Sequence, residues 1–271
     1  MRDEITYADF LSYFPYAPTA LVIKECVRLG AMKEHGCPPP ILDVGCGDGL
    51  FARLAFEDAE VWGIDIDGNE ARRAQASRSY SQVVLADVTT AHLPKGFFGA
   101  CVANCSLEHV PDLPAAARNI LAALRPGGVF YAFVPDRAWA GQMLSSRLLR
   151  GLKLGPLAGI LDEAVNTVFK HHHLEDAEGW RAIFEDVGFV VDRVEPVGST
   201  ASTMAFEAFL LPSLLGWVNK KVTGRWTLTP GLRKAASLPV YAMVKSVLEL
   251  NPLQAPTAEY LLIAHRPAEQ G

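Results

Sequence analysis

The 271-residue sequence lacks any long apolar run, since no stretch reaches the roughly 18 uninterrupted apolar residues that a membrane-spanning helix requires. The first residues, MRDEITYADF, also lack the apolar segment of a secretory signal. Cysteines are few, and their odd number of five offers no disulfide framework. These absences predict a protein of the reducing cytoplasm, and a hydrophobic content of 50% is sufficient for a sizeable core.

Acidic residues are absent from two long segments. Residues 137–161 and 208–248 hold ten Lys and Arg residues but neither Asp nor Glu, which leaves 15 basic against 30 acidic residues elsewhere. Both segments are apolar, so we expect them to pack as a helical cap with solvated lysines, to cover a hydrophobic, phosphate-bearing ligand, or to lie peripherally on the anionic inner face of a membrane. Nucleic acid is not an expected partner, because these segments are too apolar and the remainder is strongly acidic.

Short β-branched runs alternate with helix-like stretches along the chain. Five runs begin at residues 41, 61, 83, 99 and 128, and two more lie at 190–196 and 260–267. Residues 113–124 place apolar side chains at helical spacing, and RPGG at 125–128 indicates the end of that helix. Strands that alternate with helices favour parallel pairing. We therefore predict an α/β protein with a Rossmann-like, doubly wound sheet of seven strands.

Three segments lie outside this alternation. Residues 1–38 contain a helical stretch at 17–34 followed by CPPP, and residues 137–170 and 199–257 are apolar, basic insertions. The insertions lie near strand ends, where a sheet of this kind binds its ligand. We predict one domain over residues 1–271, in which 1–38 form a helical lid, 137–170 follow the fifth strand, and 199–257 form a cap between the sixth and seventh strands.

Glycine is concentrated in ILDVGCGDGL, residues 41–50, at a predicted strand-to-helix turn. A tight turn explains one glycine, whereas three indicate that a ligand approaches the main chain closely. A phosphate-binding loop requires Lys and Ser/Thr after the glycines, but Leu50 and Phe51 stand there. A dinucleotide fingerprint requires the third glycine one residue later. The spacing therefore disfavours both a nucleoside triphosphate and a nicotinamide dinucleotide.

Further motifs continue the pattern in order. VWGID ends in Asp65, and LADV contains Asp87. They are followed along the chain by VANCSLEHVPDL, LAALRPGG and HHHLEDAEGWRAIFEDVGF. Together with the D-x-G-x-G-x-G run, these motifs resemble the class I S-adenosylmethionine-dependent methyltransferases, in the small-molecule, methyltransferase-11-like type. The resemblance implies S-adenosyl-L-methionine as the cofactor, S-adenosyl-L-homocysteine as the product, and a small-molecule methyl acceptor.

The resemblance also assigns residues to the cofactor. Asp65 matches the family's acceptor for both ribose hydroxyls, a role that suits the two oxygens of a carboxylate. Asp87 and the backbone N–H of Val88 match positions beside the adenine. As an alternative, Asp65 and Asp87 cap the helices that follow them, and Cys46 is a packing residue. The expected cofactor-binding set is Asp43, Gly45, Cys46, Gly47, Gly49, Asp65, Ile66, Asp87, Val88, Asn104 and Ser106.

Three histidines are the candidates for catalysis. Methyl transfer from a sulfonium is an in-line displacement, and positioning can supply roughly 7–11 kcal/mol of its barrier. A base is needed only where the acceptor loses a proton. His109 in SLEHV and His171 and His173 in HHH are candidates for proton transfer or substrate contact, with packing or a solvated loop as the alternatives. No acid has metal-like spacing to these histidines, so no metal site is predicted.

Tyr13, Tyr16 and Asp136 complete the expected site as substrate contacts, although the tyrosines alternatively pack in the core. The basic, apolar insertions favour an apolar or lipid-linked acceptor of glycan, isoprenoid or natural-product type. The pattern specifies neither the methylated atom (oxygen, nitrogen or carbon) nor an oligomeric state. Two other functions fit a similar sheet: a nicotinamide-dependent oxidoreductase, and a non-catalytic relative that binds the cofactor.

Overall fold

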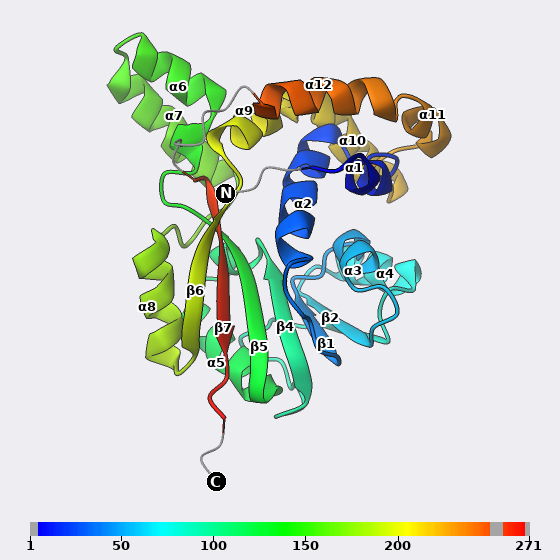
Figure 1. Cartoon of the computed structure of the whole chain (residues 1–271), viewed down its shortest axis with the longest axis vertical. Coiled ribbons are helices and arrows are strands. Elements are labelled where there is room, and N and C mark those ends of the chain that lie inside the picture. Colours follow the sequence, from blue (N-terminus) through cyan, green and yellow to red (C-terminus); the bar gives the residue numbers. More distant parts are fainter. Residues whose placement is uncertain (1–4, 250–256, 269–271) are drawn as a thin grey trace. The chain divides into compact units, whose positions relative to one another are not determined.

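The fold is built on a seven-stranded sheet in the order β3-β2-β1-β4-β5-β7-β6 (Figure 1). The computed structural model describes residues 5–249 and 257–268. All seven predicted strands are present: β1 (Ile41–Val44), β2 (Val61–Asp65), β3 (Gln82–Leu85), β4 (Phe98–Asn104), β5 (Leu124–Pro135), β6 (Val190–Val197) and β7 (Glu259–His265).

Strands β1 to β5 pair in parallel and in matched register. Val44, Ile64, Val84 and Ala103 form one row across the sheet, so the loops after β1, β2, β3 and β4 leave it at the same edge. Strand β7 runs in the opposite direction to β5 and β6 (Figure 1). The expected parallel pairing therefore does not extend to β7, because the direction of a strand depends on where the preceding segment ends rather than on its own residues.

Helices account for most of the remaining chain. They are α1 (Tyr7–Tyr13), α2 (Thr19–Met32), α3 (Leu50–Ala55), α4 (Gly68–Ser77), α5 (Leu113–Ala123), α6 (Leu144–Gly151), α7 (Gly155–Val168), α8 (Ala177–Val187), α9 (Thr200–Ala208), α10 (Leu210–Thr223), α11 (Pro230–Ala235) and α12 (Ser237–Glu249), with the 3₁₀ helices η1 (Leu107–His109) and η2 (Ala140–Gln142).

The chain divides into two compact units. The first comprises Met1–Glu34, Ala138–Phe169 and Pro196–Glu259, and the second comprises His35–Arg137, Lys170–Glu195 and Tyr260–Gly271. The first unit thus groups the amino-terminal helices with both insertions that the sequence singled out. Residues 1–4 of the predicted lid and 250–256 of the predicted cap lie outside the described residues.

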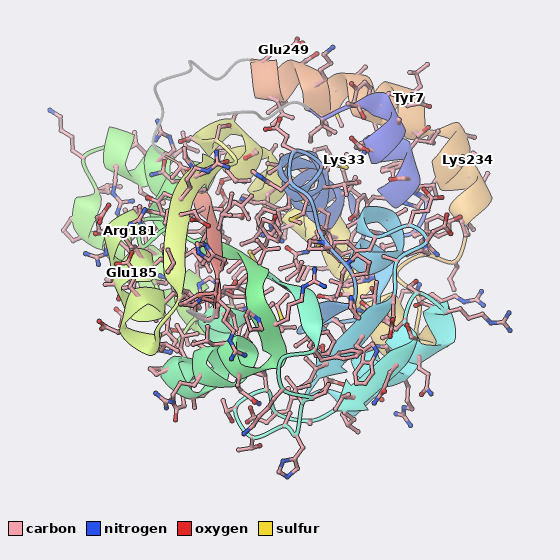
Figure 2. All side chains as sticks on the ribbon, turned by 60° about the horizontal axis from the view of Figure 1, so that its bottom comes forward. Tyr7, Lys33, Arg181, Glu185, Lys234 and Glu249 are labelled. Atoms are coloured by element: carbon pink, nitrogen blue, oxygen red, sulfur yellow. The ribbon has the colours of Figure 1, made fainter. Side chains whose placement is uncertain are left out.

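The second unit buries its core between the sheet and the helices α5 and α8. The apolar stripe predicted for residues 113–124 is the buried face of α5, which ends at Ala123. Phe184 of α8 packs on Phe130 of β5 with ring centroids 5.3 Å apart, and the indole of Trp180 donates to the Pro135 carbonyl. On the outer face of α8, Arg181 and Glu185 form an ion pair one turn apart (Figure 2). The helix is therefore amphipathic, with Trp180 and Phe184 on its buried face.

The RPGG segment ends α5 as expected but does not form a separate turn. Strand β5 begins at Leu124, directly after the helix, and includes RPGG. Gly127 has φ 72°, and the register between β4 and β5 shifts between Phe98 and Ala100. The glycines therefore provide an irregularity inside a strand.

The first unit is held together by a buried cluster of charges. Glu259, at the start of β7, forms ion pairs with Lys24 and Arg28 of α2. Lys24 also donates to Thr203 of α9. Burial alone would raise the pKa of Glu259, but the two cations outweigh burial and bring it down to about 2. The cluster joins α2, α9 and the first residue of β7.

Tyr7 connects α1 to a distant part of the first unit, and Lys33 connects the end of α2 to α1 (Figure 2). The hydroxyl of Tyr7 in α1 lies 2.9 Å from that of Ser237 in α12. Lys33, just after α2, pairs with Asp9 of α1. Segments that are far apart in the sequence therefore pack as one body.

No single helix in the described residues is long and apolar enough to cross a membrane. Helices α9 and α10 satisfy the length and composition criteria only when taken together, and they are bent by 60°. Six residues of α9 are buried in the first unit, which is the usual state of a core helix.

Candidate active site

The glycine run forms the turn between β1 and α3 in the second unit. Gly45, Gly47 and Gly49 all have positive φ, so the backbone of the turn favours glycine at all three positions, whereas the sequence led us to expect this at only one. At Gly45 an added Cβ would lie 2.4 Å from Cβ of Ser106. At Gly47 nothing lies within 4 Å of that position. The turn is therefore tightly packed at its start and open at its middle, where a ligand has room to approach the main chain.

Asp65 lies beside this turn, at the end of β2. One oxygen of its carboxylate accepts from the Gly47 N–H and the other from the Asp67 N–H, both at 2.8 Å. Each oxygen keeps further lone pairs for additional donors, such as two hydroxyls. The structure thus brings together the glycine run and the acid that the sequence paired with it.

Asp43 and Cys46 are buried residues that pack at the glycine turn. The Asp43 carboxylate is buried and accepts from the Tyr80 hydroxyl at 2.7 Å, and burial beside that carboxylate raises the pKa of Tyr80 far above its ordinary value. Burial likewise raises the pKa of the Cys46 thiol, and Asp43 adds to the shift. A thiol that stays protonated is a packing group rather than a nucleophile. Sequence reasoning missed Tyr80, because a tyrosine between two serines carries no distinctive signal.

Asp87 and Val88 follow β3 at the same edge of the sheet. The Asp87 carboxylate is exposed and accepts from the backbone N–H and the hydroxyl of Thr89. Val88 is buried, and its carbonyl accepts from Asn119 of α5. Ile66, just after Asp65, is 71% exposed and offers an apolar surface beside the carboxylate.

The segment after β4 contacts the glycine run directly. Ser106 donates to the Val44 carbonyl at 2.6 Å, and its Cβ faces Gly45. Between Asn104 and Ser106, Cys105 adopts a left-handed backbone with φ 47°, which is unusual for a residue with a side chain. Asn104 and Ser106 are the two predicted cofactor contacts in this segment. The Ser106 hydroxyl is already used in a hydrogen bond that joins this segment to the end of β1.

Two of the three candidate histidines meet beside η1. The rings of His109 and His171 stack with centroids 5.4 Å apart. Nδ1 of His109 lies 3.2 Å from the Lys170 carbonyl, and Nε2 lies 3.7 Å from the Glu108 carboxylate. Burial lowers the pKa of His109 below its ordinary value, although the hydrogen bond to the carbonyl opposes the shift.

His173 points elsewhere. Its Nε2 lies 3.0 Å from the Val110 carbonyl and 3.3 Å from the Pro111 carbonyl. Its hydrogen-bonding capacity is therefore directed to the backbone after η1. His173 is therefore directed away from the stacked rings of His109 and His171.

The family of the chain follows from comparison with known proteins. A family model described as a methyltransferase domain matches residues 19–194, which include the glycine run, Asp65, Asp87 and the histidines. The chain belongs to the class I S-adenosylmethionine-dependent methyltransferases. This result confirms the predicted family and S-adenosyl-L-methionine as the cofactor of that family, and it disfavours the nicotinamide alternative.

Individual relatives share shorter segments with this chain. It is 42% identical over 91 residues to an uncharacterized methyltransferase of Mycobacterium tuberculosis, covering 32% of this chain and 46% of the relative. It is 32% identical over 114 residues to a ubiquinone biosynthesis O-methyltransferase of Idiomarina loihiensis, covering 39% and 47%. The chain thus spans about half the length of these relatives.

A solved structure of geranyl diphosphate methyltransferase in complex with S-adenosylmethionine has a similar fold. Its TM-score is 0.56, with 16% identity, over 89% of this chain and 84% of that one. At this identity the likeness concerns the fold alone, and it agrees with the predicted Rossmann-like sheet.

The three predicted substrate contacts differ in their surroundings. Tyr13 and Tyr16 belong to the first unit, where Tyr13 is completely buried and Tyr16 is 46% exposed. Packing therefore explains Tyr13, which was the alternative that the sequence left open. Asp136, at the end of β5, accepts from the Tyr260 hydroxyl at 2.6 Å.

Glu108 is the second residue that sequence reasoning missed. It precedes His109 in SLEHV, yet no acid shows metal-like spacing to the histidines along the sequence. Its side chain is buried, and its carbonyl accepts from the backbone N–H groups of His172 and His173. The fold thereby brings the Glu108 carboxylate and the His109 ring close to the ring of His171, which lies far away along the chain. The spacing of residues in the sequence does not predict this group.

Proposed function

We propose that this chain transfers a methyl group from S-adenosyl-L-methionine to a small apolar or lipid-linked acceptor. The binding of the methyl donor is supported by one observation. The main chain at Gly47 has free space beside it and lies next to the Asp65 carboxylate, at the edge of the sheet where the parallel strands end. Ligands of open α/β sheets bind at this edge. In this proposal Asp65 accepts from the ribose hydroxyls, Asp87 and Val88 lie beside the adenine, and Gly45 and Gly47 adjoin the amino acid part of the donor.

Chemically, the donor supplies its own electrophile, because the sulfonium sulfur takes the electron pair of the breaking S–CH₃ bond. The chain has to hold the acceptor in line and exclude water. His109 closely follows Ser106, whose side chain packs on Gly45, and the ring of His171 stacks on that of His109. We therefore assign both histidines to the polar group of the acceptor. A relative named for ubiquinone biosynthesis supports an isoprenoid-like acceptor.

Calorimetric titration with S-adenosyl-L-methionine tests the donor site. We expect Asp65→Ala to weaken binding by at least tenfold, because two charge-assisted hydrogen bonds are each worth about 1.5–3 kcal/mol. Asp65→Asn should fall between Ala and wild type, since one amide oxygen still accepts. Glu57→Ala removes an exposed carboxylate of the same unit and should bind as wild type does. Equal affinities for wild type and Asp65→Ala would remove the proposed role of Asp65.

The acceptor half of the proposal draws on helix α10, none of whose residues is buried. Leu211, Leu215, Val218 and Val222 follow helical spacing and are exposed, so they form one apolar face. The only charges of this helix are Lys220 and Lys221 in its last turn.

The surroundings of α10 add aromatic rings and further positive charge. Nζ of Lys221 lies 3.7 Å from the ring centroid of Trp217, and Nζ of Lys220 lies 4.3 Å from that of Trp226. Lys234 of α11 continues the positive charge, and the next acid is Glu249 at the end of α12 (Figure 2). This composition suits a helix that lies on an anionic bilayer. We propose that α10 docks there and gives the enzyme access to a lipid-linked acceptor.

Vesicle flotation tests this docking. Wild type should float with phosphatidylglycerol-containing vesicles at low salt and less at high salt, because counterions screen the attraction. The pair Lys220→Glu/Lys221→Glu should bind at least tenfold more weakly, since each basic residue contributes about 1 kcal/mol. Lys95→Glu makes the same kind of charge change at an exposed site in the second unit and serves as the control. If wild type does not float, or if both variants float alike, the docking proposal fails while the donor site stands.

A further inference from the structure

Glu108, His109 and His171 place three potential metal ligands together. One donor atom of each residue lies within 4.8 Å of the donor atoms of the other two. Two come from η1 and the third from the segment before α8, so the fold rather than local sequence creates the group. Ligands of one tetrahedral Zn²⁺ stand about 3.4 Å apart when each bond is about 2.1 Å long, so small side-chain rotations complete the contact.

The hydrogen bonds around His109 select which of its nitrogens faces the group. A backbone carbonyl can only accept, so the contact with the Lys170 carbonyl places the proton on Nδ1. Nε2 then faces the Glu108 carboxylate, 3.7 Å away, and is the nitrogen that a metal ion can reach. A carbonyl that fixes the tautomer of a histidine is also the usual support for a metal-binding imidazole.

The backbone holds the two segments in this arrangement. The carbonyl of Glu108 accepts from the N–H of His172 at 2.8 Å and from that of His173 at 3.2 Å. Lys170 has φ 56°, a left-handed conformation that is costly for a residue with a side chain and that directs its carbonyl to His109. The group is therefore positioned before any ligand arrives, by contacts that lie wholly within the second unit.

We propose that Glu108, His109 and His171 bind a divalent transition-metal ion of the Zn²⁺ type. Two imidazole nitrogens and one carboxylate oxygen are a donor set that suits Zn²⁺ better than Mg²⁺ or Ca²⁺, which prefer oxygen alone. Three protein ligands leave a position open for water or for an oxygen atom of the acceptor. The binding itself does not depend on the proposed methyl transfer; only the role of the open position rests on it.

Metal titration of the full chain, with any affinity tag removed, tests the proposal without donor or acceptor. Zn²⁺ should bind at one site per chain, and Co²⁺ should give the visible absorption of a metal with nitrogen and oxygen ligands. Mg²⁺ should bind at least tenfold more weakly than Zn²⁺. Glu108→Gln and His171→Ala should each weaken Zn²⁺ binding by at least tenfold.

His172→Ala is the matched control, because it removes an adjacent exposed imidazole and keeps the backbone hydrogen bond to Glu108. It should bind Zn²⁺ as wild type does. Circular dichroism and thermal unfolding without metal identify any variant that fails to fold, and His171→Ala decides the matter if Glu108→Gln does not fold. An absence of saturable Zn²⁺ binding in wild type, or equal binding by His171→Ala and His172→Ala, would overturn the metal site. Neither result bears on the binding of S-adenosyl-L-methionine.

Discussion

Gly45 combines two demands that only a residue without a Cβ meets. Its φ is 74°, and an added Cβ would lie 2.4 Å from Cβ of Ser106. We expect Gly45→Ala to lower the free energy of unfolding by about 2–4 kcal/mol, of which the left-handed backbone accounts for about 1–2 kcal/mol and overpacking for the rest. Denaturant titration measures the loss.

A second variant separates the two causes. Ser106→Gly removes the atoms that the new methyl group would meet, so the double variant should recover the overpacking part and retain the backbone part. Additive losses in the double variant would show that the contact with Ser106 is not the source of the strain.

Individual residues of the donor site were predictable to different degrees. Asp65 followed from the resemblance of VWGID to the family's motif, and parallel strands that end at one edge bring it to the glycine run, where it accepts from the Gly47 N–H. Tyr80 and Glu108 were not predictable, since each reaches its partner through contacts that the fold creates. His173 shows the opposite case, in which a residue type suited to catalysis has its ring directed to two backbone carbonyls.

Glu259 joins elements of the first unit through charge. Its folded pKa of about 2 lies below the ordinary 4.5, so its stabilising contribution is fully present above about pH 4.5 and is lost as the pH falls toward 2. Glu259→Gln leaves Lys24 buried without the acid of its ion pair and Arg28 with Glu25 alone, and it should lower the free energy of unfolding at pH 7 by about 3–5 kcal/mol.

Glu249→Gln is the control for this prediction, because Glu249 is exposed on α12 and pairs only loosely with Lys245. Its effect at pH 7 should stay within about 0.5 kcal/mol. Urea titrations of both variants from pH 7 to pH 3 provide the measurement. Should both lose the same stability at pH 7, the buried cluster does not join α2 to β7 as described.

At the level of elements, the strands and helices of the second unit were predictable because their apolar periodicities differ. The reversal of β7 was not predictable, since a strand has the same side-chain alternation in either direction. The irregularity at Gly127 was also missed, because RPGG is equally typical of a turn and of a bulge.

For the whole molecule, the segregation of charge is apparent from the order of residues alone. The amino-terminal helices and both insertions fall in the unit that contains the acid-free segments 138–161 and 208–248. That these separate stretches form one body was not predictable, because it depends on contacts such as those of Glu259 and Tyr7 between distant segments.

The division of the chain has a consequence for how the molecule is made. Each unit is assembled from three stretches that alternate along the chain, so neither corresponds to a continuous piece of the gene. During synthesis the first unit stays incomplete until the ribosome has passed residue 259, while most of the second unit's sheet has already emerged. Completing the first unit closes long loops, an entropic cost that slows folding. Truncation or domain exchange at a single cut point between residues 35 and 259 therefore removes part of both units at once.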